Sequence, residues 1–130
     1  MDYQPIDPAL NKISGLIVDS AYQVHSTLGP GLLESVYQKC MVVELREKGI
    51  SVETEIQIPI QYKHHNIDAN LRIDMLVGNE IVVELKSVEQ LLSVHEAQLL
   101  TYLKLSGKRL GLLINFNVPV IKAGIKRIIV

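Results

Sequence analysis

Apolar residues recur at three- and four-residue spacing in the first part of the chain, which predicts two consecutive helices. The first pattern opens at Pro8 and ends at the Gly29-Pro30-Gly31 segment, and the second follows at once and stops at Gly49. Proline suits the first turn of a helix, whereas glycine and proline are typical of its end. The predicted stripes contain Ile13, Leu16, Ile17, Val24 and Leu28 in the first helix, and Leu33, Val36, Tyr37, Cys40, Met41 and Leu45 in the second.

From Ile50 onwards the apolar period falls to two residues, which predicts strands. The first strand contains Pro59, and proline restricts a strand to a sheet edge or a bulge. Residues 63–66 are typical of a turn into the next strand, and we expect its adjacent His64 and His65 to be exposed to solvent.

The last third of the chain predicts one more helix and two more strands. Ser93 and Glu96 form a capping-box signature for the helix, and Gly107 provides its end. Residues 109–116 and 125–130 are apolar enough to be short strands. The predicted order is α-α-β-β-β-α-β-β, which we interpret as an α/β (α+β) fold in a single domain spanning residues 1–130.

Residues 71–86 predict a β-hairpin whose apolar side chains share one face. A two-residue turn at Gly78-Asn79 would set the apolar faces of the two strands on opposite sides. A three-residue loop, residues 78–80, or an equivalent bulge keeps the faces together and pairs Asp74 with Glu84. The apolar face would then contain Leu71, Ile73, Met75, Val77, Ile81, Val83 and Leu85.

The opposite face of this hairpin carries Arg72, Asp74, Glu84 and Lys86, a candidate site. Directly paired side chains have Cβ atoms about 4.5–5.5 Å apart, so two ionised carboxylates in this register repel each other. The positive charge that they need could come from Arg72 or Lys86 in an ordinary ion network, or from a divalent cation. The hairpin alone leaves both interpretations open, although charged residues are rarely buried in a strand without a partner or a function.

Composition bounds the class of protein. With 130 residues and 48% hydrophobic content, the chain can form a real core. No stretch approaches eighteen apolar residues and the first residues lack a basic leader pattern, so we expect a cytoplasmic protein without a membrane span. Cys40 is the single cysteine, which excludes an internal disulfide and a cysteine-based zinc cluster; its place in a helical stripe indicates core packing.

The charges are distributed unevenly along the chain. The net charge of −1 argues mildly against a strong nucleic-acid binder. All acidic residues lie at or before Glu96, however, so the C-terminal third can either form one basic surface or be basic by chance. The basic residues of that third are Lys104, Lys108, Arg109, Lys122, Lys126 and Arg127.

Three motifs together resemble the GxxExxY family, a small branch of the PD-(D/E)XK nuclease superfamily. The likeness extends from about residue 13 to residue 130, and the order and spacing of the motifs make it specific. Isoleucine instead of proline precedes the hairpin aspartate, a change that leaves the chemistry intact. The motifs are Gly31-Leu-Leu-Glu34-Ser-Val-Tyr37, the hairpin with Asp74 and Glu84-Leu-Lys86, and the helical Gln98-Leu-Leu-Thr-Tyr102.

The resemblance implies a restriction-endonuclease-like domain with a central mixed sheet flanked by helices. It also implies that Asp74 and Glu84 hold Mg²⁺ (or Mn²⁺) and that Lys86 orients or activates the attacking water. Magnesium takes oxygen ligands and keeps several waters, so two carboxylates leave room for a phosphate and a nucleophile. Glu34 would complete the metal site directly or through water; alternatively, it only favours the macrodipole at the start of its helix.

Other residues of these motifs are expected near the site. Gln98 and Tyr102 would support it and meet nucleic acid, or else satisfy buried polar groups within the fold. His95 shares their helix face and could line the cleft, and Tyr37 is presented together with the motif glutamate one turn before it. His25 is either a further metal ligand or a packing and capping residue.

Two functions follow from the resemblance. The first is a metal-dependent nuclease that hydrolyses phosphodiester bonds of DNA or RNA. The second is a non-catalytic module that binds nucleic acid or protein and keeps the nuclease fold. Near-neutral charge and few aromatic residues favour weak or partner-assisted binding, for which a homodimer would double the basic surface.

Overall fold

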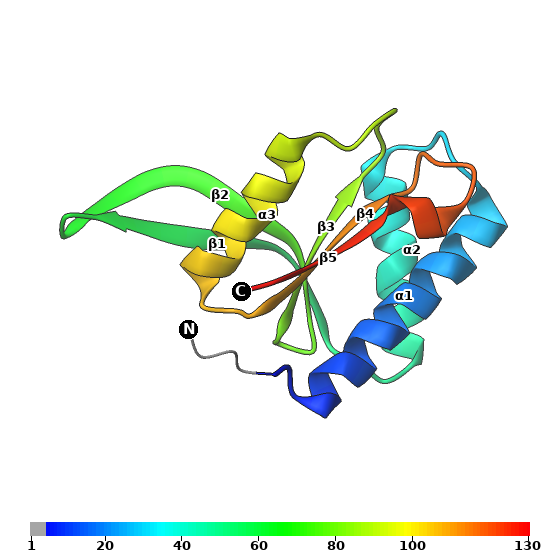
Figure 1. Ribbon diagram of the computed structural model, residues 1–130, viewed down its shortest axis with the longest axis horizontal. Coiled ribbons are helices and arrows are strands. Elements are labelled where there is room, and N and C mark those ends of the chain that lie inside the picture. The colour runs from blue at the N-terminus through cyan, green and yellow to red at the C-terminus, as the bar shows by residue number, and fades with distance from the viewer. Residues whose placement is uncertain (1–4) are drawn as a thin grey trace.

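The computed structural model describes residues 5–130, which form a five-stranded mixed β-sheet with helices on both faces (Figure 1). The element order confirms the predicted α-α-β-β-β-α-β-β arrangement, with an additional 3₁₀ turn, η1, before the last strand. The elements are α1 (Pro8–Leu28), α2 (Glu34–Glu47), β1 (Val52–Tyr62), β2 (His65–Val77), β3 (Ile81–Lys86), α3 (Ser93–Ser106), β4 (Leu110–Asn115), η1 (Ile121–Gly124) and β5 (Ile125–Ile129).

The strands lie in the order β1-β2-β3-β4-β5, and only the β3–β4 pair is parallel. A parallel pair needs a crossover connection, and α3 supplies it by running across one face of the sheet. The carboxyl ends of β3 and β4 therefore meet at the same edge of the sheet. No helix within residues 5–130 is long and apolar enough to span a membrane.

The sheet separates two hydrophobic cores. The larger core lies between the sheet and the α1–α2 layer, and it includes Ile17, Tyr37, Met75 and Phe116. The smaller core lies under α3. It includes Leu99 of α3 and residues of β2, β3 and β4. Both faces of β3 are therefore covered, which explains why its sequence is apolar at almost every position.

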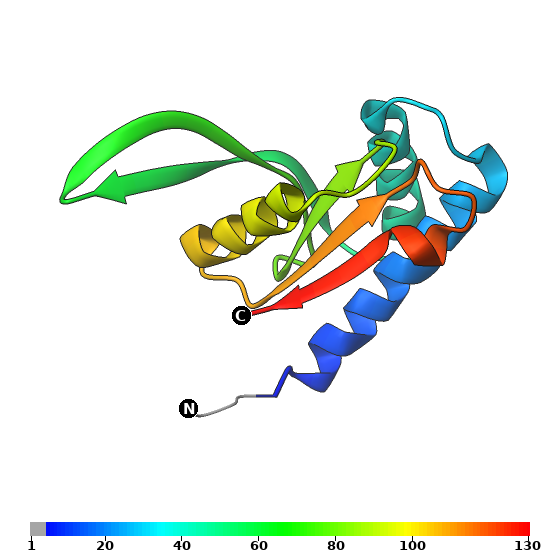
Figure 2. The ribbon, with the colours of Figure 1, turned by 45° about the horizontal axis from the view of Figure 1, so that its top comes forward.

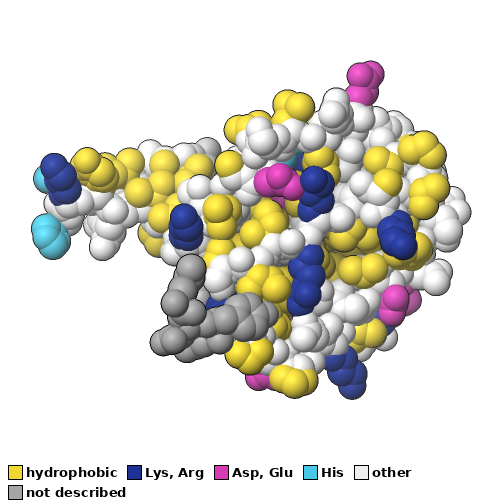
Figure 3. Space-filling model, in the orientation of Figure 1, with side chains coloured by type: hydrophobic (Ala, Val, Ile, Leu, Met, Phe, Trp, Pro, Cys, Tyr) yellow, Lys and Arg dark blue, Asp and Glu magenta, His cyan; other side chains and the backbone are white. Residues whose placement is uncertain are grey.

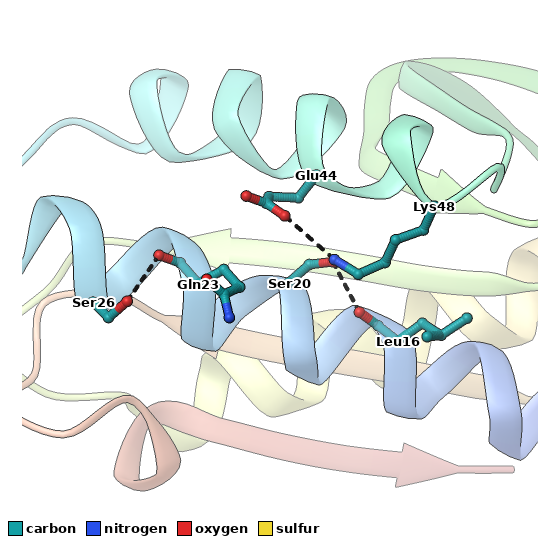
Figure 4. A network of polar contacts seen from close by, with 6 residues as sticks. All are labelled: Leu16, Ser20, Gln23, Ser26, Glu44 and Lys48. Atoms are coloured by element: carbon teal, nitrogen blue, oxygen red, sulfur yellow. Dashed lines mark hydrogen bonds and ion pairs between the residues drawn. The ribbon is translucent and has the colours of Figure 1, made fainter.

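A polar contact inside the helical layer joins α1 to α2 (Figure 4). The Lys48 ammonium donates to the Ser20 hydroxyl at 2.8 Å and forms an ion pair with Glu44 at 3.3 Å. The Ser20 hydroxyl in turn donates to the carbonyl of Leu16 at 2.8 Å. Because Ser20 is fully buried, these bonds satisfy a polar group that would otherwise destabilise the interface between the two helices.

The β2–β3 hairpin has the predicted register. Val77 pairs with Ile81 across a three-residue loop, residues 78–80, and Met75 pairs with Val83. Gly78 and Asn79 adopt left-handed backbone conformations there, with φ angles of 60° and 59°. This register places the hairpin aspartate opposite the hairpin glutamate, as the apolar pattern requires.

The prediction that all seven odd-numbered apolar residues share one face is wrong for two of them. Met75 packs in the core under α1 and α2, whereas Leu71 and Ile73 pack in the core under α3. The reason is that the β2–β3 ladder ends at Met75, and the remainder of β2 continues with β1 alone. This two-stranded extension, residues 56–72, curves out of the sheet as an arm (Figures 1 and 2).

Pro59 lies where the prediction placed it, in an edge strand and at a bulge. β1 is the outermost strand, and the β1–β2 register shifts between Ile58 and Ile60. Proline has no N–H to donate to the ladder, so a bulge on the edge strand accommodates it without an unsatisfied partner.

The basic residues of the C-terminal third do not form one continuous surface. Lys126 pairs with Glu96 of α3 at 3.0 Å, whereas Arg127 donates to the side chain of Asn11 on α1. Neighbouring residues of a strand point to opposite faces, so these two cations of β5 lie on opposite sides of the sheet. Figure 3 shows the Lys and Arg side chains of the α3 face separated by apolar and neutral ones.

Candidate active site

Asp74 and Glu84 lie where β2 separates from β3, and each carboxylate bonds to the opposite strand. The Asp74 N–H donates to Glu84 Oε1 at 3.1 Å, and the Leu85 N–H donates to Asp74 Oδ2 at 2.9 Å. These bonds take over from the backbone ladder, which ends one residue earlier. The two carboxylates are thus fixed side by side between the diverging strands, as predicted from the hairpin register.

The electrostatics of this pair are unfavourable. Glu84 is only 4% exposed, and burial together with the negative charge of Asp74 raises its pKa to about 9, although Lys86 opposes the shift. Burial disfavours a carboxylate, and a second carboxylate nearby disfavours it further. At neutral pH, without an added cation, Glu84 therefore retains a proton beside Asp74.

The two side chains proposed to neutralise the pair in an ordinary ion network do not do so. Arg72 is exposed and donates to the side chain of Asn70 at 3.4 Å. Lys86 is half-buried at the end of β3, and within residues 5–130 it forms no ion pair. Its charge still acts on Glu84, whose pKa it lowers, and its ammonium is available to a further negative group.

The backbone around Lys86 is clamped from the neighbouring strand. The Phe116 N–H donates to the Lys86 carbonyl at 2.9 Å. Asn115 binds the next turn of chain with both ends of its amide: its Nδ2 donates to the Val88 carbonyl at 2.9 Å, and its Oδ1 accepts the Val88 N–H at 3.1 Å. Asn115 is a residue that the sequence analysis missed, although a polar side chain in an apolar strand was a usable signal.

A cavity of about 180 Å³ opens beside Asp74. It places Glu34, the first residue of α2, in the same hollow as Asp74, as the motif predicted. Glu34 is exposed and lies at a helix start that no side chain caps, where the macrodipole favours a negative group. The cavity is lined by Glu34, Ser35, Gln38, Glu55, Asp74 and Leu85.

Glu55 is a third carboxylate of the cavity, and the sequence analysis missed it. The pairs on either side of it, Thr54 with Met75 and Ile56 with Ile73, place Glu55 opposite Asp74. Its backbone is left-handed, with a φ angle of 53°. Gln38 of α2 donates to Glu55 Oε1 at 3.3 Å and to the Asp74 carbonyl at 2.8 Å. Gln38 could have been identified because it follows Glu34 by four residues on the same helix face.

Tyr37 organises the loop that leads to Glu34. Its ring is fully buried and stacked on Phe116, with ring centroids 4.3 Å apart. Its hydroxyl donates to the Gly29 carbonyl at 2.6 Å and accepts the Leu32 N–H at 3.1 Å. Ser87, which follows the site lysine, donates to the Leu32 carbonyl at 2.6 Å. The loop before α2 is therefore tied to the end of β3.

We expect Tyr37→Phe to destabilise the fold by about 1–3 kcal/mol, because it leaves two backbone groups of this loop without their partner. Thermal unfolding monitored by circular dichroism measures the effect. Tyr62→Phe is the matched control, since that ring is 62% exposed, and its melting temperature should match that of the wild type. Equal melting temperatures for all three proteins would contradict the proposed role of the Tyr37 hydroxyl.

Tyr102 of α3 lies close to the carboxylates, whereas Gln98 does not bond within the fold. Tyr102 is buried, and this burial raises the pKa of its hydroxyl, with a further contribution from the charges of Glu84 and Asp74. The Gln98 side chain is exposed and makes no hydrogen bond with the described residues. Gln98 therefore does not satisfy buried polar groups of the fold, which was one of its two predicted roles.

The predicted capping box of α3 is wrong. Ser93 is already the first helical residue, and Leu92 precedes it at the cap position. His95 supplies the cap instead, because its Nδ1 accepts the Leu92 N–H at 2.9 Å, while Glu96 pairs with β5. Because the helix begins one residue earlier than predicted, His95 and not Glu96 is the third helical residue, whose side chain accepts the N–H of the cap residue. His95 is half-buried and has a capping role in α3.

His25 has the packing role of its two interpretations. It lies buried in the last turn of α1, and its Nε2 donates to the Val118 carbonyl at 2.7 Å. This ring nitrogen is therefore bonded to the loop after β4 and is not free to bind a metal. His64 and His65 are exposed at the tip of the arm, as predicted.

The donor set fits a hard divalent cation with few protein ligands. No group of three His, Cys, Asp or Glu side chains within residues 5–130 is close enough to hold a metal together. Asp74 and Glu84 nevertheless converge, and a cation between them would favour the ionised form of Glu84 that burial and Asp74 disfavour. Magnesium is usually bound through one or two carboxylates and completes its shell with water.

Comparison with known proteins agrees with this geometry. A family model described as the PD-(D/E)XK nuclease superfamily matches residues 11–128. The chain belongs to the PD-(D/E)XK nuclease superfamily. A search of curated proteins and a search of solved structures each gave no match. Membership of the superfamily agrees with the observed mixed sheet flanked by helices.

Proposed function

We propose that this superfamily member is a divalent-metal-dependent nuclease of the GxxExxY branch, which hydrolyses phosphodiester bonds of DNA or RNA. The observation that carries the proposal is the pair of carboxylates held between β2 and β3, with Lys86 beside them and outside any ion pair of the described residues. Structural ion networks neutralise their charges internally. An acidic pair with a strongly raised pKa and no ion-pair partner is typical of a site with a cationic ligand.

Asp74 and Glu84 would hold the metal, Mg²⁺ or Mn²⁺, and Glu34 would reach it through water from the shared cavity. A bound divalent ion supplies an acidified water and charge neutralisation at the phosphate. The hydrogen bonds from the Asp74 and Leu85 N–H groups hold each carboxylate in place before any ligand arrives. Such preorganisation means that little rearrangement is needed on binding.

Lys86 would stabilise the negative charge that develops on the phosphate, because the clamps from Asn115 and Phe116 fix the backbone that carries it. Gln98, exposed on α3, is available to contact the nucleic acid, and Tyr102 would support the carboxylates from below. We assign structural roles to Tyr37, His95 and His25. We further propose that residues 1–130 are one such domain and that it acts in the cytoplasm.

We expect millimolar Mg²⁺ or Mn²⁺ to raise the melting temperature by several degrees, because a ligand of the native state stabilises it by about 2.7 kcal/mol at 100 times its Kd. Differential scanning fluorimetry with and without chelator measures the shift. Asp74→Asn should abolish most of it, whereas Asp68→Asn, a carboxylate exposed on the arm, should keep it. The same metal response in both variants would rule out the assigned ligands.

The decisive test of the function is a cleavage assay. Purified protein is incubated with single- and double-stranded DNA and RNA in Mg²⁺ or Mn²⁺, beside a chelator control. We expect metal-dependent cleavage of at least one substrate. Binding without cleavage of any of them would favour the alternative, a nucleic-acid- or protein-binding module, which the near-neutral net charge of −1 and the absence of tryptophan support.

A further inference from the structure

The arm, residues 56–72, extends away from the globular part of the molecule. Every residue from 61 to 70 is exposed, and Figures 1 and 2 show both strands continuing past the end of α3. The tip is a two-residue turn in which Lys63 and His64 have left-handed φ angles of 48° and 71°. Two left-handed central residues are typical of the hairpin turn that matches strand twist, so the tip has a defined shape.

The side chains at the tip suit a polyanion with exposed bases. Tyr62 is 62% exposed, and the Lys63 ammonium lies 5.6 Å from the centroid of its ring. His64 and His65 are exposed beside them, and Figure 3 shows a Lys or Arg and two His side chains at the far end of the arm. Imidazole and ammonium N–H groups donate to phosphate oxygens, and a tyrosine ring stacks on bases.

The charge of the arm differs from that of the rest of the chain. Residues 56–67 contain no Asp or Glu, although the chain as a whole has 14 acidic and 13 basic residues. Only Asp68 and Arg72 carry further charge within the arm, and they offset each other. A polyanion therefore meets no repulsion along the outer half of the arm, in contrast to the acidic cavity at its base.

The arm begins at the candidate active site. Asp74 belongs to the same strand as His65, nine residues away, which corresponds to at most about 30 Å at 3.3 Å per residue. A nucleic-acid strand advances about 3.4 Å per nucleotide, so the tip would reach it about nine nucleotides from the scissile phosphate. A two-stranded ribbon also has the width that the major groove of a duplex admits.

We propose that the arm is a second nucleic-acid-binding element, which grips the polynucleotide beyond the bond that is cleaved. The proposal rests on the proposed nuclease function and assigns its substrate class: a polynucleotide that extends to the tip, and not a nucleotide or a short oligonucleotide. Lys63, His64 and His65 contact phosphates, and Tyr62 stacks on a base.

The test measures binding by fluorescence anisotropy for the full chain in Mg²⁺, in the Lys86→Ala background so that substrates stay intact. Single strands and duplexes of about 30 nucleotides are compared with ones of about 5, which at about 3.4 Å per nucleotide are too short to span from the site to the tip. The tip is changed by Lys63→Asn/His64→Gly, a pair that suits the same turn, and separately by Tyr62→Ser. Lys12→Asn, on the exposed surface of α1, is the matched control.

We expect Lys63→Asn/His64→Gly to weaken binding of the long substrate about 3- to 10-fold and to reduce its salt slope by about one. Tyr62→Ser should weaken it about 10-fold. Binding of the short substrate and of the control variant should stay within about twofold of the parent, because neither involves the tip.

Unchanged binding of long substrates in both tip variants would overturn the proposal, as would a parent protein that binds no nucleic acid. The arm also carries apolar side chains, including Ile67, which is 45% exposed. Tip variants that convert a dimer to a monomer in light scattering, without loss of nucleic-acid binding, would therefore assign the arm to self-association instead. If the wild-type protein binds long substrates through the tip but cleaves none, the binding role of the arm holds and the nuclease function is wrong. If it cleaves nucleic acid and the tip variants bind and cleave equally well, the nuclease function holds and the binding role of the arm is wrong.

Discussion

Lys86→Ala should lower the turnover of nucleic-acid cleavage by about 10²–10³-fold, since it removes a charge directed at the transition state. The Lys86 ammonium acts on Glu84 through its charge but forms no ion pair with the described residues, so its loss leaves no structural partner unsatisfied. Affinity for the uncleaved substrate should fall only modestly, because ground-state binding uses other residues. Single-turnover kinetics with saturating enzyme separates the two effects.

Two variants make this result specific. Lys12→Ala changes an exposed lysine of α1 and should cleave like the wild type. Lys86→Arg keeps the positive charge on a longer, planar group and should restore little activity, because the clamped backbone sets the position of the ammonium. If Lys86→Ala lowered affinity and left turnover intact, the lysine would be a binding residue and the assigned role would be wrong.

Glu84→Gln should raise the melting temperature of the metal-free protein by about 5 °C or more at pH 8. The pKa of Glu84 is about 9 in the fold against 4.5 for the ordinary group, so the native state prefers the protonated form. The stability that protonated Glu84 contributes to the native state is therefore fully present below pH 4.5 and is lost as the pH rises towards 9. The amide stays uncharged at every pH and can donate to Asp74, so the variant escapes this loss.

Melting temperatures recorded from pH 5 to pH 9 in chelator test the prediction. The wild type should lose stability progressively across this window, whereas Glu84→Gln should show a flatter profile. Glu89→Gln, at an exposed position, should follow the wild type. Parallel profiles for Glu84→Gln and the wild type would mean that the buried carboxylate is not the destabilising group.

Local patterns were sufficient to predict most of the fold and the centre of the site. The period of the apolar residues predicted α1, α2 and the strands, and the signals at its ends predicted α3. One-sided burial predicted the hairpin register that joins Asp74 to Glu84. Both are short-range properties, since they depend on which face of one element is covered. The position of Glu34 beside them came from the motif resemblance, because no local pattern relates residues 40 positions apart.

The features that escaped prediction arise from contacts between distant elements. Alternation alone could not show that Leu71 and Ile73 turn to the α3 side, because the sheet divides at a point set by β1 as well as β3. Glu55 has a left-handed backbone, which is rare for glutamate and could not be predicted from the residue type. α3 begins one residue earlier than its capping signature predicts, so His95 accepts the N–H of the cap residue and Glu96 pairs with Lys126 of β5 instead.

The clamp from β4 onto the end of β3 implies an order in which the site assembles during folding. The two carboxylates come from neighbouring strands joined by a three-residue loop, so their pairing can form locally and early. The clamp that holds the lysine backbone requires Asn115, which is 27 residues from its partner Val88 and separated from it by the crossover helix. Closing that larger loop is slower. A chain that has formed only β1, β2 and β3 thus has the acidic pair without a fixed lysine, and the proposed site is complete only when β4 docks.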